Sequence, residues 1–276
     1  MAQNKPAVIV DDIVRVLETL RERRPLVHCM TNEVVKDITA NILLAIGASP
    51  AMVEHAEEAA EFAAIADALL INVGTLDTTQ MEAMRAAIAS ATLAEKPWVL
   101  DPVAIGAISL RTRFSREILA QRPALIRGNA SEIIALAGRA GKGRGADSGD
   151  SAEHALDAAA QLVAQTGNAV LVTGPVDYAL DAARTLACAN GHPLLTRVTG
   201  VGCAQGALAA ACVAVAPDKI HGAAAAAVFM AIAGELAAAR APRPGSFRTA
   251  LIDELDRLDA DTIRKFAKLE TVKQNA

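Results

Sequence analysis

The chain has 276 residues, of which 53% are hydrophobic and 3% aromatic, and its formal net charge is -4. This length can bury a substantial core, and the negative charge without a basic stripe argues against a nucleic-acid partner. The four cysteines lack C-x-x-C spacing and the five histidines lack the H-E-x-x-H pattern, so we expect no structural zinc and a reducing cytoplasm.

Helices and strands alternate through the first half of the chain. The predicted order is helix 10–23, strand 26–30, helix 34–46, strand 51–53, helix 57–66, strand 68–73, helix 78–91, strand 98–100, helix 113–121, strand 124–127 and helix 131–137. Pro25 follows the first helix, and Gly47 closes the second, as a C-terminal glycine does. Near the start of the chain, Lys5, Asp11 and Asp12 interrupt any apolar run, so we expect no targeting segment.

The second half begins with a glycine-rich, charged segment at 138–150, which we expect to be a mobile surface loop. The elements predicted after it are helix 151–165, strand 169–173, a hairpin between 178 and 195, helices 203–216 and 220–240, and one charged helix at 247–268. Asn190-Gly191 is the predicted hairpin turn. The stretch 223–239 is mostly alanine but contains Glu235, which favours a buried helix over a membrane span.

This alternation predicts an α/β fold with a mostly parallel central sheet and helices on both faces. No change of composition separates two units, so we expect a single α/β domain over residues 1–276. Ligands of open α/β sheets bind beyond the carboxyl ends of the strands. The polar residues there are Thr31-Asn32, Asn72-Gly74-Thr75, Asp101-Pro102, Arg127-Gly128-Asn129, Thr173-Gly174 and Thr199-Gly200. Each has an ordinary structural explanation, but together they predict a polar rim.

The turn Gly200-x-Gly202 opens an alanine-rich helix. Its unpaired N–H groups and positive dipole end suit a phosphate, although small residues also allow a helix to pack closely. Cys203 falls in the first turn, where we expect the pKa of a thiol to be lowered. From Gly200 to Gly206 the glycine spacing is one residue longer than the dinucleotide fingerprint, and a P-loop is absent, which disfavours an NAD-dependent oxidoreductase.

A second group, Asn129-x-x-Glu132, directly follows a predicted strand. It is compatible with a helix cap, in which Glu132 is the third helical residue. It is equally compatible with a magnesium site in which Asp101 and Glu132 hold Mg²⁺ through water, because Mg²⁺ takes only one or two carboxylates beside phosphates.

These two groups together resemble the ribokinase-like superfamily. Cys203 stands where most of that superfamily has a catalytic aspartate, and this narrows the resemblance to the hydroxyethylthiazole kinase family over about residues 10 to 260. Further segments in the same order as in that family are His28-Cys29-Met30-Thr31-Asn32, Thr39-Ala40-Asn41, Gly47-Ala48-Ser49-Pro50-Ala51-Met52, Asn72-Val73-Gly74-Thr75-Leu76, Leu100-Asp101-Pro102-Val103, Ile126-Arg127-Gly128-Asn129, Val172-Thr173-Gly174 and Asn190-Gly191-His192.

The resemblance implies an enzyme of thiamine biosynthesis or salvage. It would phosphorylate the hydroxyl of 4-methyl-5-(2-hydroxyethyl)thiazole, with ATP as co-substrate and Mg²⁺ as cofactor, and would be a homotrimer with the site between subunits. The residues it implies are Cys203 for catalysis, Met52 and Gly200 for the thiazole, Arg127, Thr173 and Gly202 for ATP and its phosphates, and Asp101 and Glu132 for the metal.

Two segments stand out against that pattern. Ala104-Ile105-Gly106 occupies a place that usually reads glycine-alanine-glycine, and Gln205 is polar for its helix face. Plainer roles also remain open for two residues: Met52 could be core packing, and Arg127 could be a salt-bridged surface residue. The alternative functions are a kinase for another small alcohol, such as a hydroxymethylpyrimidine, and a non-catalytic nucleotide-binding protein of the same fold.

Overall fold

The computed structural model describes residues 8–139 and 152–272. Its centre is a nine-stranded sheet with the order β2-β1-β3-β4-β5-β6-β7-β8-β9. The strands are β1 (Leu26–Met30), β2 (Ser49–Ala51), β3 (Ala68–Asn72), β4 (Trp98–Asp101), β5 (Leu125–Asn129), β6 (Ala169–Thr173), β7 (Asp177–Leu180), β8 (Thr185–Cys188) and β9 (Leu269–Val272). β1 to β6 pair in parallel, and β6 to β9 pair antiparallel.

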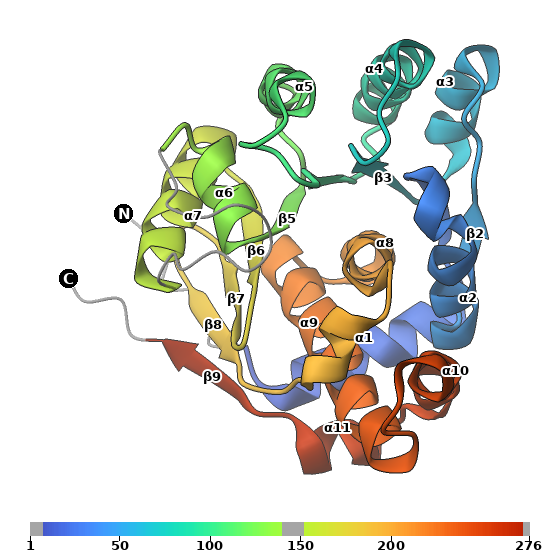
Figure 1. The fold of residues 1–276 in the computed structure, drawn as a ribbon, viewed down its shortest axis with the longest axis vertical. Helices are drawn as coiled ribbons and strands as arrows, with labels where there is room; N and C mark the ends of the chain where they lie inside the picture. The colour runs from blue at the N-terminus through green and yellow to red at the C-terminus, as the bar shows by residue number, and fades with distance from the viewer. Residues whose placement is uncertain (1–7, 140–151, 273–276) are drawn as a thin grey trace.

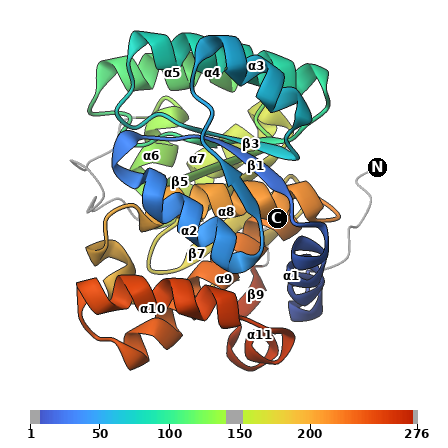
Figure 2. The same ribbon diagram turned by 90° about the vertical axis from the view of Figure 1, so that its right-hand side faces the viewer.

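Helices cover both faces of the sheet, as the alternation predicts (Figures 1 and 2). One face is covered by α3 (Ala56–Ile65), α4 (Thr78–Leu93), α5 (Ser109–Leu119), α6 (Ala130–Leu136) and α7 (Ala152–Thr166). On the other face lie α1 (Val10–Arg23), α2 (Lys36–Ile46), α8 (Val201–Val215), α9 (Lys219–Arg240), α10 (Pro244–Arg257) and α11 (Ala260–Phe266). Because both faces are covered, β3 is buried at every residue, and its run Ala-Leu-Leu-Ile-Asn is apolar up to its last position.

Small residues let α8 and α9 pack closely at the centre of this layer. A Cβ at Gly222 of α9 would lie 2.8 Å from the backbone of Val213 on α8, so only glycine fits there. α9 is long and apolar enough to cross a membrane, but 83% of its most apolar stretch is buried inside the protein. The prediction of a buried helix is therefore confirmed.

Two predicted elements differ from the structure in the second half of the chain. The hairpin joins β7 to β8, but its turn is at 181–184, where Asp181 Oδ1 accepts from the amides of Ala183 (2.8 Å) and Arg184 (2.7 Å). The prediction of a turn at Asn190-Gly191 was wrong. The buried side chain of Asn190 instead donates to the carbonyl of Phe266 (2.8 Å) and accepts from the amide of Lys268 (2.7 Å).

The C-terminal segment is also more divided than predicted. Instead of one helix at 247–268 there are α10 and α11, separated where Asp259 caps α11 by accepting from the amide of Thr262 at 2.8 Å. β9 then pairs with β8. The first strand after α2 runs 49–51 rather than 51–53, and a 3-10 helix, Pro193–Arg197, precedes α8. From residue 140 on, the predicted mobile loop lies outside the described residues.

Candidate active site

The register of the parallel strands brings several strand-end side chains together. Asn72 at the end of β3 is paired with Asp101 at the end of β4. Asn72 Nδ2 donates to Asp101 Oδ2 at 2.6 Å, and Asn72 Oδ1 accepts from Asn32 Nδ2 at 3.1 Å and from the amide of Gly74 at 3.0 Å. The polar rim predicted from the strand ends is therefore confirmed for these residues.

The start of α8 lies next to these strand ends. Gly200, its N-cap, has φ +91°, and a Cβ there would lie 2.7 Å from Ile38 Cγ2. Glycine is needed at this position both for the left-handed backbone and for the contact with α2. Cys203 falls in the first turn of α8, as predicted, and its Sγ accepts from Asn32 Nδ2 at 3.4 Å.

The expected ionisation of Cys203 was wrong. Burial raises the pKa of its thiol to about 11, and the nearby carboxylate of Asp101 adds to this rise. Hydrogen bonds from Asn72 and Asn32 and the charge of Arg127 act in the opposite direction but do not overcome burial. The thiol is therefore neutral near pH 7, because desolvation outweighs the field of the helix N-terminus.

Asp101 is the most deeply placed acid of the rim, with no exposed surface. Burial raises its pKa to about 7; Arg127 and the bond from Asn72 lower it, and Glu132 raises it further by repulsion. Its Oδ2 is bonded to Asn72, whereas its Oδ1 lies 3.6 Å from Arg127 Nη1 and has no hydrogen bond within the described residues.

Arg127 lies inside the protein, with 8% of its surface exposed, so the alternative of a surface arginine was wrong. Its Nε and Nη2 both donate to Gln205 Oε1, at 3.2 and 2.9 Å. The guanidinium also lies against the start of α8, since a Cβ at Gly202 would be 3.2 Å from Nη2. The only sequence signal for Gln205 is a polar residue in an alanine-rich helix, which gives no partner.

Glu132 forms the predicted helix cap. Asn129 Oδ1 accepts from the amide of Glu132 at 3.0 Å, and Glu132 Oε2 accepts from the amide of Asn129 at 2.9 Å. The other oxygen, Oε1, accepts from the amide of Ala104 at 2.9 Å. The cap does not exclude a metal role, because each carboxylate oxygen retains a second lone pair.

The donor set fits a water-mediated Mg²⁺ site. Asp101 contributes an oxygen without a hydrogen bond, and Glu132 lies close enough to raise its pKa. Within residues 8–139 and 152–272 no group of three or more His, Cys, Asp or Glu side chains could form a full metal cage. Mg²⁺ does not require one, since it retains several waters and binds one or two carboxylates beside phosphates.

The unusual segment after Asp101 has a defined shape. Ala104 has φ +58° and Gly106 φ +90°, both in the left-handed region that favours glycine. Ala104 therefore carries a strain of about 1 kcal/mol that a glycine would avoid. Its amide is held by Glu132, and Ile105 is buried in the core on the α4–α6 side of the sheet.

Thr173 and Met52 lie on either side of the central strands. Thr173, at the end of β6, is paired with Asn129 and donates from Oγ1 to the carbonyl of Gly128 at 3.4 Å. Met52 follows the edge strand β2, which β1 and β3 separate from β4. It is half-buried and packs against the core, so core packing accounts for part of its surface, and its contact with thiazole stays a prediction.

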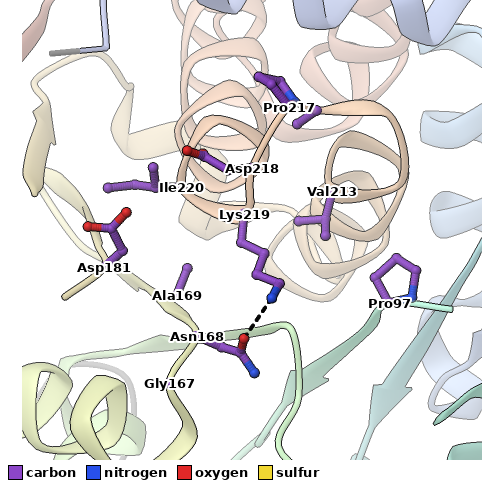
Figure 3. A pocket seen from close by; sticks show the side chains of 11 residues that line it. Pro97, Gly167, Asn168, Ala169, Asp181, Val213, Pro217, Asp218, Lys219 and Ile220 are labelled. Atoms are coloured by element: carbon purple, nitrogen blue, oxygen red, sulfur yellow. Dashed lines mark hydrogen bonds between the residues drawn. The ribbon is translucent and has the colours of Figure 1, made fainter. Parts of the chain in front are cut away.

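A pocket at the amino ends of the parallel strands is lined by none of these residues (Figure 3). It is lined by residues preceding β4 and β6 and by the α8–α9 turn, including Pro97, Asn168, Asp218 and Lys219. Lys219 Nζ donates to Asn168 Oδ1 at 2.8 Å, as the dashed line in Figure 3 shows. Because the polar rim lies at the carboxyl ends of the strands, this pocket is separate from the candidate site.

Comparison with known proteins identifies the family to which this chain is similar. Residues 17–261 match the model of the hydroxyethylthiazole kinase family. Hydroxyethylthiazole kinase from Kineococcus radiotolerans is 56% identical over 91% of this chain and 91% of its own length, and that from Granulibacter bethesdensis is 51% identical over 95% and 96%.

Solved structures give the same result. The hydroxyethylthiazole kinase protein of Pyrococcus horikoshii OT3 superposes with a TM-score of 0.89 and 43% identity, covering 95% of this chain and 100% of that one. A pyridoxal kinase from Bacillus subtilis, in complex with ADP, has a TM-score of 0.57 at 17% identity over 75% of this chain and 90% of its own, which shows the ribokinase-like fold alone. By sequence and by structure, this chain belongs to the hydroxyethylthiazole kinase family.

Proposed function

We propose that this protein transfers the γ-phosphoryl group of ATP to the hydroxyl of 4-methyl-5-(2-hydroxyethyl)thiazole, in thiamine biosynthesis or salvage. The observation that carries the proposal is the start of α8, where Gly200-x-Gly202 precedes Cys203 above Asp101 and Arg127, in a chain 56% identical to a hydroxyethylthiazole kinase. The hydroxyl oxygen bonds to the γ-phosphorus as the bond to the bridging oxygen of ADP breaks, ADP leaves, and the hydroxyl proton is released to solvent.

For the individual residues we propose the roles that the resemblance to this family implies. Arg127 and Thr173 bind ATP, and the amides from Gly200 to Cys203, including that of Gly202, face the transferring group at a helix N-terminus. Gly200 and Met52 contact the thiazole. Cys203 lies beside the hydroxyl as a neutral thiol, which suits a loose transition state that needs little help from a base. Charge stabilisation is then the larger contribution.

Asp101 and Glu132 would hold Mg²⁺ through water. When bound, the metal neutralises charge on the leaving diphosphate. Among the described residues, the nearest cation to the unbonded Oδ1 of Asp101 is Arg127, at 3.6 Å, which supports a site that can accept an additional cation.

The proposal is tested by incubating the protein with ATP and Mg²⁺ and either the thiazole alcohol or hydroxymethylpyrimidine. Phosphorylation of the thiazole alcohol, detected by mass spectrometry and lost when Mg²⁺ is chelated, is the expected result. Preference for the pyrimidine would favour the alternative kinase, which Cys203 in place of aspartate weighs against. Absence of either product would favour a non-catalytic nucleotide-binding protein, against which the retained Asp101 and Glu132 argue.

We also propose a cytoplasmic homotrimer. Four free thiols support a reducing compartment. The supporting surface for assembly is the edge strand β2, next to which Leu44 of α2 is 60% exposed, while Ile65 at the end of α3 is 66% exposed. Met52 directly follows β2, which would put the thiazole contact at a subunit boundary. Light scattering should give three times the monomer mass, and Leu44→Asp should lower it, whereas Leu110→Asp on α5 should not.

A further inference from the structure

Gln205 lies on α8, two residues beyond Cys203, with 6% of its surface exposed. It is the one amide side chain in this helix, and half of the other buried residues of α8 are alanine. Its amide connects two segments that lie on different strands. Oε1 accepts from Arg127 on β5, and Nε2 donates to Asp177 Oδ2 on β7 at 3.3 Å.

The contact with Arg127 controls the orientation of the guanidinium. Because Nε and Nη2 both donate to the single oxygen Oε1, the plane of the guanidinium is fixed relative to α8. The other N–H groups of Arg127 remain available to Asp101, whose Oδ1 lies 3.6 Å from Nη1, and to a phosphate. Gly202 leaves room for this arrangement, because a Cβ there would crowd both terminal nitrogens at 3.2 and 3.4 Å.

The contact with Asp177 extends to the other predicted nucleotide segment. Asp177 Oδ1 accepts from the amide of Gly174 at 2.9 Å, and Gly174 directly follows Thr173. Asp177 is itself buried; burial raises its pKa to about 6, while Gly174, Arg127 and Gln205 act to lower it. The amide of Gln205 thus joins the arginine and the threonine-glycine turn through one continuous set of hydrogen bonds.

We propose that Gln205 is a positioning residue for the nucleotide, which aligns Arg127 and, through Asp177, the Thr173-Gly174 turn. This inference rests on the proposed function in taking ATP as the ligand of those two segments. Gln205 does not itself touch the reacting atoms. Its effect is therefore on nucleotide binding rather than on the alcohol.

The chemistry requires glutamine rather than glutamate at this place. The amide offers an acceptor to Arg127 and a donor to Asp177, and a carboxylate has no donor. In Gln205→Glu two carboxylates would face each other at about the present 3.3 Å, and their repulsion would displace the side chain that orients Arg127. Adding Asp177→Asn restores a donor on the opposite side and returns the net charge to that of the wild type.

The test compares Gln205→Glu, Gln205→Met and the double variant Gln205→Glu/Asp177→Asn. Calorimetry with ADP gives the dissociation constant, and kinetics give the KM for ATP and for the thiazole alcohol. Each single variant should weaken ADP binding and raise the KM for ATP about tenfold, as loss of a buried hydrogen bond to a charged group predicts. The KM for the alcohol should stay within about twofold, and the double variant should recover ADP binding to within about threefold.

Gln80→Met is the matched control. Gln80 of α4 is similarly buried, but in the described part of the chain its side chain bonds to the helix cap at Asp77, so this variant should lower the melting temperature and leave ADP binding unchanged. Unchanged ADP binding in Gln205→Met, or a double variant as weak as Gln205→Glu, would overturn the positioning role. If the wild type phosphorylated a different alcohol, the proposed function would fail while the ADP measurements would still decide the role of Gln205.

Discussion

Asn72 Nδ2 donates a hydrogen bond of 2.6 Å to Asp101 Oδ2, and both side chains are completely buried. The two residues are direct neighbours in the register of β3 and β4. This bond satisfies one carboxylate oxygen only, so the protein carries a buried acid that is half-bonded and has a pKa of about 7.

Asp101 should make the protein less stable as the pH rises toward neutrality. Its folded pKa is raised from 3.8 to about 7, so the folded state binds more protons than the unfolded state between those values. The free energy of unfolding therefore falls from about pH 4 to about pH 7, by on the order of 2–4 kcal/mol. Urea unfolding in chelator should show this fall, and Asp101→Asn should remove most of it.

Asp177→Asn serves as the comparison for that measurement. Burial raises the pKa of Asp177 to about 6, so its contribution to the fall ends one unit lower. The loss of stability between pH 6 and 7.5 should therefore persist in Asp177→Asn and disappear in Asp101→Asn. The same slope in both variants would mean that another group is responsible.

Replacing Cys203 should have a small effect. A thiol with a pKa of about 11 is protonated near pH 7, so Cys203→Ala should lower kcat by less than about tenfold, below the 10²–10⁴-fold typical of a lost general base. Cys203→Asp should stay active, because a carboxylate can accept the hydroxyl proton, and its kcat should fall more steeply at low pH than that of the wild type, because the new carboxylate is protonated there. A loss of 10²-fold or more in Cys203→Ala would restore the thiol as base.

Glu132→Gln should lower both stability and metal use. The amides of Asn129 and Ala104 each donate to one carboxylate oxygen, and glutamine can accept from only one of them. We expect a loss of about 1–3 kcal/mol in the free energy of unfolding and a higher Mg²⁺ concentration for half-maximal rate. Asn129→Ala removes the other half of the cap and keeps the carboxylate, so it should lower stability without that change in Mg²⁺ dependence. Equal Mg²⁺ dependence in both variants would leave Glu132 as a helix cap alone.

Gly200→Ala should be more damaging than the same change at Gly138. Both glycines have a positive φ, +91° and +80°, but a Cβ at Gly200 meets Ile38 at 2.7 Å, whereas a Cβ at Gly138 meets no described residue within 4 Å. Backbone strain alone costs about 1–2 kcal/mol, and overpacking adds about 1–3 kcal/mol at Gly200. Urea unfolding should resolve this difference. Equal losses would show that α2 moves aside.

Local signals predicted the fold well where an element carried its own pattern. The helix at 10–23 and the strands at 26–30 and 169–173 have the predicted bounds, since their apolar spacing and flanking breakers are sufficient. The turn at Asn190-Gly191 was wrong because Asn190 forms its hydrogen bonds with residues 266 and 268, about 76 positions away. β9 was missed for a related reason: its strand character depends on pairing with β8, and its own residues are mostly exposed.

In the candidate site, too, local signals predicted some features, and contacts between distant segments decided the others. Strand ends indicated Asp101, Asn72 and Arg127 because the carboxyl ends of parallel strands share one edge. The ionisation of Cys203 could not be predicted, since the expected field of the helix N-terminus was known from the sequence but the degree of burial was not. Gln205 was visible as a polar residue, but its partners come from β5 and β7 and depend on how α8 lies across the sheet.

Cys203 and Gln205 lie two positions apart in one mostly buried helix, α8. In the roles that we propose, this helix orients Arg127 on the nucleotide side through Gln205 and reaches the alcohol side through Cys203. A small displacement of α8 therefore carries the two halves of the reaction in the same direction.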